Sequence, residues 1–201
     1  MANYRTSRIL PIILVIVIII IAIAALVSLA RVVFFSGSTT SKTAAADVSR
    51  DALLNTSVGR SVSMTVRGPI VADEEFQSYR INISPNTREV TTYKGYLDTV
   101  VNTEALTNNV ASYEQFVYAL DKANFPTGKE LSGDKNDVRG ICATGRVYEF
   151  KILNNGTSVK SLWTSTCKGS SGSLNASTTQ LTSLFVAQIP DADKLIKKVN
   201  L

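Results

Sequence analysis

The stretch VYEFKILNNGTSVKSLWTST (Val147–Thr166) decides the fold, because it has every feature of a β-hairpin. Apolar and polar residues alternate on both sides of Asn155-Gly156, as they do in strands with one buried face. An Asn-Gly pair also tolerates the positive φ angles that a type I′ turn requires. The hairpin therefore predicts that an antiparallel sheet forms the centre of the domain.

The position of this turn also sets a register for the hairpin. It places Ile152 opposite Val159, and further from the turn it places Tyr148 opposite Trp163. Both pairs join apolar side chains, and such cross-strand pairs stabilise an antiparallel ladder. We therefore expect this register.

The two cysteines of the chain, Cys142 and Cys167, flank the hairpin. In the expected register Thr144 lies opposite Cys167, so a bulge at Gly145 is needed to bring Cys142 to its partner. Outside the cytoplasm such a pair forms a disulfide, which here would close a loop of about 25 residues and contribute about 2–4 kcal/mol. Two buried thiols are the alternative interpretation.

Further strands are expected before the hairpin. Ser61–Arg67 and Gln77–Ser84 alternate between apolar and polar residues, and Arg88–Tyr93 returns after a turn. Gly95 is suited to a bulge, which allows this third strand to run on to Val101. Together with the hairpin, these segments predict four or five antiparallel strands.

The clearest helix signal covers Ser112–Asn124. Ser112 and Gln115 match a capping box, and apolar residues recur at helical spacing on one side. Two shorter helices are expected, one after Ser177 and one over Asp191–Val199. The sequence thus predicts the α+β class, with an antiparallel sheet of four or five strands packed against two or three helices.

The N-terminal part of the chain has a different character. Ile9–Ala30 is 22 residues long and carries no charge, so as a helix it spans roughly 33 Å, enough to cross a bilayer. The apolar character continues past Arg31, which predicts a transmembrane anchor at 9–35 with the lipid bilayer as its partner. Cleavage of a signal peptide after Ala30 is the alternative, but the apolar run is longer than the roughly 7–15 residues typical of one.

The anchor divides the chain into four expected parts. Residues 1–8 form a short cytoplasmic tail, because the arginines before the apolar run favour an N-terminus inside. Residues 36–59 form a small, polar linker or juxtamembrane segment, in which Ala44–Leu54 allows a helix. Residues 60–201 form an α+β domain outside the cytoplasm. The expected location is the cell membrane, with a single span.

Composition excludes several kinds of chemistry. The chain has no histidine, which removes Ser-His-Asp and Cys-His catalysis and the common zinc sites. The part of the chain after the anchor contains 18 of the 21 basic residues and all 16 acidic residues. Its net charge is therefore only +2, which does not indicate nucleic-acid binding. Asp73-Glu74-Glu75 is the densest acidic cluster and is interpreted as an exposed turn. We therefore predict no catalytic, cofactor-binding or metal-binding residue, and no cofactor.

Two families share features with this chain. The layout of apolar N-terminal helix, antiparallel sheet and C-terminal cysteine pair resembles that of type IV pilins and pseudopilins. Their processing motif places a glutamate inside the apolar helix, and Ile9–Ala30 has no carboxylate, so no pilin residue is carried over. Thr65–Pro190, with VRGPIVADEEFQSYRINISP, YEQFVYALDKANF and GICATGRVYEF…LWTSTC, is similar to uncharacterised single-pass membrane proteins of candidate-phylum bacteria. That resemblance implies no activity.

These features lead to three functional hypotheses. The first is a membrane-anchored binding or assembly module outside the cytoplasm, with a protein partner or an envelope complex as its target. The second is a filament subunit of the pilin or pseudopilin kind. The third is a hydrolase without histidine, which requires a deep pocket that holds two carboxylates with raised pKa values.

Overall fold

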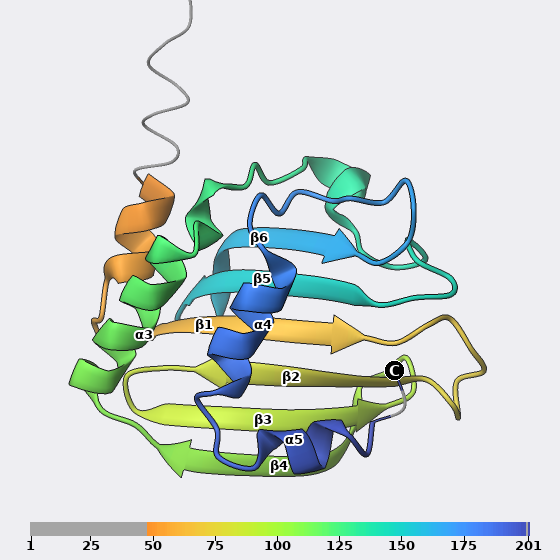
Figure 1. The fold of residues 1–201 in the computed structure, drawn as a ribbon, viewed down its shortest axis with the longest axis horizontal. Helices are drawn as coiled ribbons and strands as arrows, with labels where there is room; N and C mark the ends of the chain where they lie inside the picture. The colour runs from red at the N-terminus through yellow and green to blue at the C-terminus, as the bar shows by residue number, and fades with distance from the viewer. Residues whose placement is uncertain (1–47, 200) are drawn as a thin grey trace, which may run out of the picture. The chain divides into compact units, whose positions relative to one another are not determined.

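A single six-stranded sheet forms the centre of the computed structural model, which describes residues 48–199 and 201 (Figure 1). The strand order is β4-β3-β2-β1-β5-β6, and all neighbours are antiparallel. The strands are β1 (Arg60–Arg67), β2 (Gln77–Ile83), β3 (Thr87–Lys94), β4 (Thr99–Thr107), β5 (Val147–Asn154) and β6 (Thr157–Ser165). The predicted α+β class with an antiparallel sheet is confirmed, but the predicted count of four or five strands is too low.

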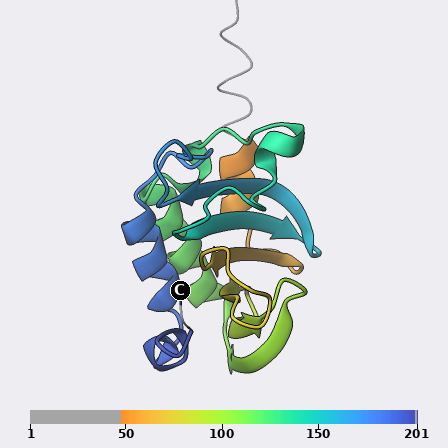
Figure 2. The same ribbon diagram turned by 90° about the vertical axis from the view of Figure 1, so that its right-hand side faces the viewer.

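Three α-helices pack on one face of this sheet, which we call the helix-covered face (Figure 2). They are α3 (Val110–Lys122), α4 (Thr178–Val186) and α5 (Ala192–Ile196). Two 3-10 turns, η1 (Phe125–Thr127) and η2 (Gly133–Asn136), lie in the connection from α3 to β5. The other face of the sheet is called the uncovered face below.

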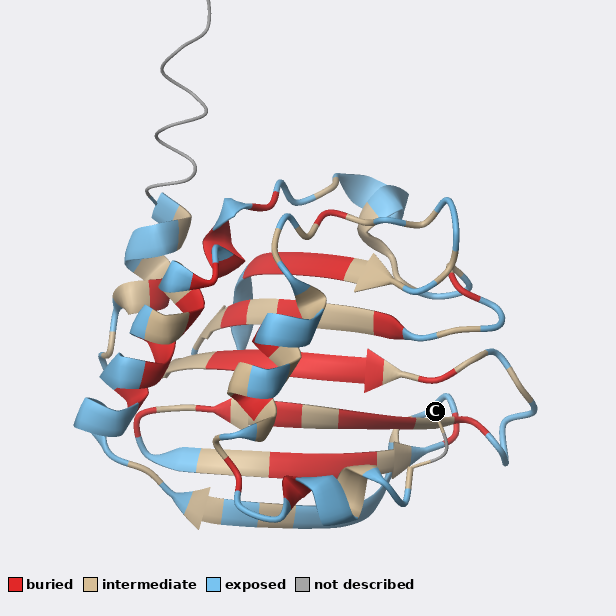
Figure 3. Cartoon of the chain, viewed as in Figure 1, coloured by how far each residue is buried: buried red, intermediate tan, exposed pale blue. Residues whose placement is uncertain are grey.

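The hydrophobic core lies between the helix-covered face and the helices, where the middle of the strands is buried (Figure 3). Phe150 of β5 is fully buried and lies against Phe125 and Phe185, with ring centroids 6.0 Å apart in each case. Phe185 in turn meets Phe116 of α3 edge to face at 5.2 Å. These rings join α3, α4 and the sheet into one core.

The expected run of the third strand from Arg88 to Val101 is wrong. The chain turns after β3 and returns as a separate strand, β4, and both Gly95 and Asp98 have positive φ angles, of 75° and 53°. β4 is the edge of the sheet, and seven of its nine residues are exposed. An exposed edge strand needs no apolar alternation, so the pattern that reveals the inner strands is missing here.

The hairpin of β5 and β6 has the predicted turn at Asn155-Gly156, where both residues have positive φ angles. The predicted pairs are wrong, because the register shifts between Ile152 and Leu153. Ile152 pairs with Lys160, and Tyr148 pairs with Thr164. The extra residue turns Leu162 to the helix-covered face opposite Phe150, where both side chains are fully buried. Core packing thus overrides the register that the turn alone predicts.

The helices lie where expected, with different ends. The side chain of Asn109 accepts a hydrogen bond from the Ser112 amide, so α3 begins two residues before the predicted start and Ser112 is not its N-cap. Ser177 caps α4 as predicted, because its side chain accepts from the Gln180 amide. α5 is shorter than the predicted helix and ends at Ile196.

Residues 48–54 are helical, within the segment Ala44–Leu54 for which the sequence allows a helix. Leu53 is fully buried in the core, and the Arg50 guanidinium pairs with the Asp121 carboxylate of α3 at 2.8 Å. The packed domain therefore includes residues that precede Arg60, where the sequence analysis placed its start.

The tail at 1–8, the anchor at 9–35 and the first part of the 36–59 segment lie outside the described residues. No helix in the described part of the chain combines the length and the apolar character that a membrane span requires.

Candidate functional site

Two adjoining hollows on the uncovered face are the best candidate site. Alternate residues of β1 form their common floor: Ser61, Ser63 and Thr65 line one hollow, and Arg67 lines the other. We call the first the polar groove, with a volume of about 490 Å³. We call the second the strand-end pocket, with a volume of about 440 Å³, which lies within the range of small-molecule sites.

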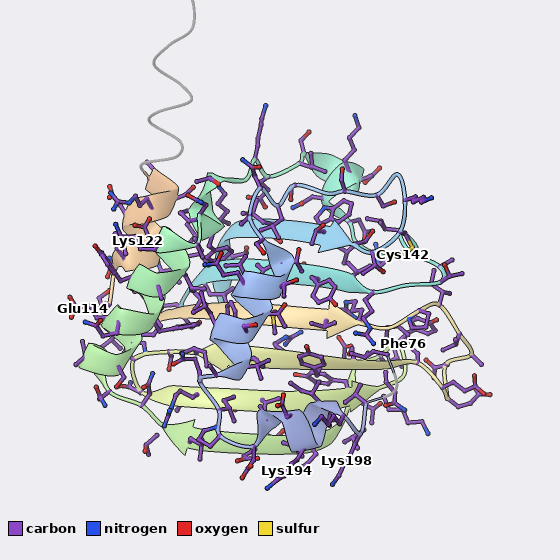
Figure 4. The ribbon with its side chains drawn as sticks, in the orientation of Figure 1. Phe76, Glu114, Lys122, Cys142, Lys194 and Lys198 are labelled. Atoms are coloured by element: carbon purple, nitrogen blue, oxygen red, sulfur yellow. A yellow bond between two sulfur atoms is a disulfide. The ribbon has the colours of Figure 1, made fainter. Side chains whose placement is uncertain are left out.

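The strand-end pocket is built by segments that are far apart in the sequence. They are the loop from β1 to β2, the turn from β3 to β4 and the loop before β5. Its walls include Phe76 and Cys142, which lie at the same end of the strands (Figure 4). The Phe76 ring stacks on the ring of Tyr96, with centroids 4.2 Å apart and planes 20° apart. This stack joins the first two segments into one wall.

Hydrogen bonds fix the position of Tyr96. Its hydroxyl donates to the Val71 carbonyl at 2.7 Å and accepts from the Val71 amide at 3.1 Å. Asp73 Oδ1 accepts from the Tyr96 amide at 2.7 Å. The acidic cluster Asp73-Glu74-Glu75 is an exposed turn, as expected, and its first member orients a wall of the pocket.

A disulfide holds the third wall. The predicted partners Cys142 and Cys167 lie side by side, with sulfur atoms 2.07 Å apart and Cα atoms 5.5 Å apart. A Cβ atom on Gly145 would lie 2.2 Å from Thr166 Oγ1 and 3.0 Å from Cys142 Sγ. Gly145 thus allows the close approach to the disulfide, while the register shift lies near the turn of the hairpin and not at Gly145.

Arg67 is the one charged side chain on the floor of the pocket. Its Nη1 donates to Asp98 Oδ1 at 3.4 Å, and these side chains are 25% and 34% exposed. The Arg67 Nε atom is buried, and no acceptor for it exists among the described residues. The guanidinium therefore has N–H groups without an acceptor among the described residues, at a place where water is partly excluded.

Arg139 lies at the edge of the pocket and has a closer partner. Its Nε donates to both carboxylate oxygens of Asp137 at 2.9 Å. The hydrogen bond from this guanidinium lowers the pKa of the Asp137 carboxyl to about 2. Asp98 is the one carboxylate that lines the pocket within the described residues. The arrangement that the hydrolase hypothesis requires, two carboxylates with raised pKa values, is not found in this pocket.

Exposed apolar side chains lie in two of the segments that build the pocket and in the strand that follows one of them. Tyr96 and Ile70 line it and are 46% and 48% exposed, Leu97 is 90% exposed, and Val100 and Val101 follow in β4. We call these five residues the apolar rim. Soluble monomers seldom expose such groups together, and a cluster of them marks an interaction site.

The polar groove has a different lining. Arg80 lies over the Tyr93 ring at 5.5 Å, and its Nε donates to Thr65 Oγ1 at 3.2 Å. Across the groove, Lys151 pairs with Glu149 at 2.8 Å. These cations already have partners within the protein, and the Glu89 carboxylate, which also lines the groove, accepts from Thr91 Oγ1 at 3.4 Å. The other lining residues offer mainly hydroxyl and amide groups.

The described residues contain no group of three or more histidine, cysteine, aspartate or glutamate side chains placed to hold a metal ion. No protein-family model matches the chain, and no curated protein matches it either.

Sequence analysis identified only the cysteines of this site. The apolar pair Tyr96-Leu97 beside Gly95 is the signal that marks the rim, because apolar residues in a turn have no core to enter. Nothing in the sequence indicates that residues near positions 70, 96 and 140 meet.

Proposed function

We propose that this protein is a membrane-anchored binding module whose domain lies outside the cytoplasm and meets its partner at the strand-end pocket. One observation carries the proposal: a pocket of about 440 Å³ whose apolar lining residues Ile70 and Tyr96 are about half exposed, with Leu97, 90% exposed, next to Tyr96 in the same turn. The 22-residue uncharged run Ile9–Ala30 supports the anchor.

The pocket is favoured over the polar groove for an energetic reason. Removal of apolar surface from water is the main source of binding free energy, and the rim offers such surface around a concave centre. The neighbouring disulfide and the Phe76–Tyr96 stack hold the walls in place, so little conformational entropy is lost on binding.

The location is tested on cells that produce the full chain. Carbonate extraction is expected to leave the protein in the membrane fraction, and protease added to cells with a permeable outer layer is expected to digest residues 60–201. Release by carbonate, or digestion only in inverted membrane vesicles, contradicts the proposed anchor and orientation.

The site is tested with a pair of matched variants. Leu97→Asp places a charge on the rim, whereas Val58→Asp places the same charge on an equally open apolar position, 86% exposed, just before the start of β1. After chemical crosslinking in native membranes, we expect Leu97→Asp to lose the crosslinked species and Val58→Asp to retain it. Equal effects of the two variants contradict the proposed site.

The same experiment separates the filament alternative. A filament subunit polymerises through its apolar N-terminal helix, so its crosslinked species is a ladder of copies of this chain. Such a ladder, unaffected by Leu97→Asp, favours assembly over binding at the pocket.

A further inference from the structure

The strand-end pocket combines an apolar lining with a guanidinium that has few acceptors among the described residues. Arg67 has five N–H donors, and in the described part of the chain its one carboxylate contact is a single hydrogen bond of 3.4 Å to Asp98. Arg139 at the edge of the pocket makes three such contacts with Asp137, which shows how a guanidinium is satisfied by a carboxylate. Arg67 contacts only one carboxylate oxygen, that of Asp98, whereas Arg139 contacts both oxygens of Asp137.

The surroundings of Arg67 strengthen any anion contact. Ile70, Phe76, Ile141 and Val147 line the same pocket, so a ligand there displaces water from around the guanidinium. A charge pair in such a place interacts more strongly than at an open surface.

We propose that the strand-end pocket binds an acyl carboxylate, with its hydrocarbon chain against the apolar walls and its carboxylate on Arg67. The inference rests on the proposed function and names the class of ligand that the pocket accepts. A carboxylate fits because it matches the planar guanidinium with two parallel hydrogen bonds. Asp98 then acts as an internal competitor that limits the affinity.

An acyl chain fits better than the C-terminus of a peptide. Peptide termini are captured by clusters of free backbone amides. Here the Gly68 amide donates to the Gln77 carbonyl at 3.1 Å, and the Ile70 amide donates to the Ala143 carbonyl at 2.9 Å. The amides beside Arg67 are thus already used, and the side chain is left as the anion-binding group.

The test is a titration of the full-length chain in lipid nanodiscs, followed through the isoleucine methyl NMR signals. Ile70 and Ile141 line the pocket, and Ile152 in the core is the internal control. The probes are butanoate, hexanoate and octanoate, with 1-hexanol and hexylammonium as matched ligands that lack the anion. We expect shifts at the two pocket residues, and an affinity that rises about fourfold for each added methylene until the pocket is full.

Two variants assign the carboxylate to Arg67. Arg67→Gln is expected to weaken hexanoate about tenfold to hundredfold and to leave 1-hexanol unchanged, because only the anion uses the guanidinium. Asp98→Asn removes the competitor and is expected to tighten hexanoate about threefold or more. Asparagine tolerates the φ angle of 53° at position 98, so the turn is retained.

The outcomes are distinct. Equal binding of hexanoate and 1-hexanol, or no effect of Arg67→Gln, overturns the carboxylate assignment. Tighter binding of acetyl-leucyl-leucine than of octanoate identifies a peptide terminus and also overturns the acyl assignment. If Leu97→Asp abolishes the crosslinked partner while no carboxylate binds, this inference fails and the proposed function stands. If carboxylates bind and no partner depends on Leu97, the proposed docking role of the rim fails instead.

Discussion

The two faces of the sheet differ although the same strands form both. In β1, Val62, Met64 and Val66 point to the helices and are at most 1% exposed. Ser63 and Thr65, the residues between them, are 4% exposed and line the polar groove. Burial of apolar side chains on the helix-covered face therefore stabilises the fold, whereas the side chains of the uncovered face are available to contact a ligand or a partner.

This division explains why the site is formed by loops and strand ends. Residues on the helix-covered face are fixed by packing, so a change of even one methylene group alters the stability of the fold. On the uncovered face polar side chains contact one another, as Arg80 does with Thr65 and Tyr93, so their identity is set by such contacts. The comparison predicts large stability effects on one face and small ones on the other.

The largest contrast is expected within β5. Phe150→Ala removes a fully buried ring and is expected to lower the free energy of unfolding by about 3–5 kcal/mol. Lys151→Ala, its neighbour on the uncovered face, breaks only the partly exposed pair with Glu149 and is expected to cost less than about 1 kcal/mol. Urea unfolding of the chain without residues 1–35 measures both, and that fragment is expected to fold because it retains Leu53. Similar losses for the two variants refute the division between the faces.

The disulfide comes next. The double variant Cys142→Ser, Cys167→Ser is expected to lose about 2–4 kcal/mol of stability, because it removes the loop constraint from the unfolded state. Mass spectrometry of unreduced native protein is expected to find no free thiol. Two free thiols, or a double variant as stable as the parent, argue for the alternative of buried thiols.

Alkaline pH tests the burial of two tyrosines on the helix-covered side. Burial raises the pKa values of Tyr79 and Tyr113 on the helix-covered side. Above about pH 10 the unfolded chain loses these protons first, so stability is full below that pH and falls by about 1.4 kcal/mol per pH unit for each tyrosine above it. Tyr113→Phe is expected to remove the contribution of Tyr113 to this slope, about 1.4 kcal/mol per pH unit above pH 10, in urea unfolding measured from pH 9 to 11. An unchanged slope shows that Tyr113 ionises in the folded state.

The smallest effect tests the helix cap. Asn109→Ala is expected to lower stability by about 1 kcal/mol, because it leaves the Ser112 amide without its acceptor. Ser112→Ala, at the start that the sequence predicted, is expected to change stability by less than about 0.5 kcal/mol. Thermal unfolding followed by circular dichroism compares the two variants. A larger loss of stability for Ser112→Ala than for Asn109→Ala supports Ser112 as the N-cap, as the sequence predicted.

Patterns that reflect one buried face were predictable from the sequence. β1, β2 and the hairpin alternate because their inward side chains enter the core, and the apolar stripe of α3 packs on them. β4 was not predictable, because an edge strand with most residues exposed has no such pattern. The prediction of the hairpin register was wrong for a related reason, because the position of Leu162 depends on packing in the core and not on the turn.

The site was largely hidden for a physical reason. Its walls come from three connections that the order of the strands brings together, and no local periodicity encodes such contacts between distant segments. Arg67 is the last residue of β1 and reads in the sequence as an ordinary strand end. Its significance follows only from the place of Asp98, 31 residues later, across the mouth of the pocket.

Site-directed photo-crosslinking in native membranes tests the central claim most directly. A photoreactive amino acid replaces Leu97 on the rim in one variant and Glu114, exposed on α3 (Figure 4), in the other. We expect the probe at position 97 to capture a defined partner and the probe at position 114 to capture none. Capture at position 114 alone, or at neither position, contradicts the assignment of recognition to the uncovered face.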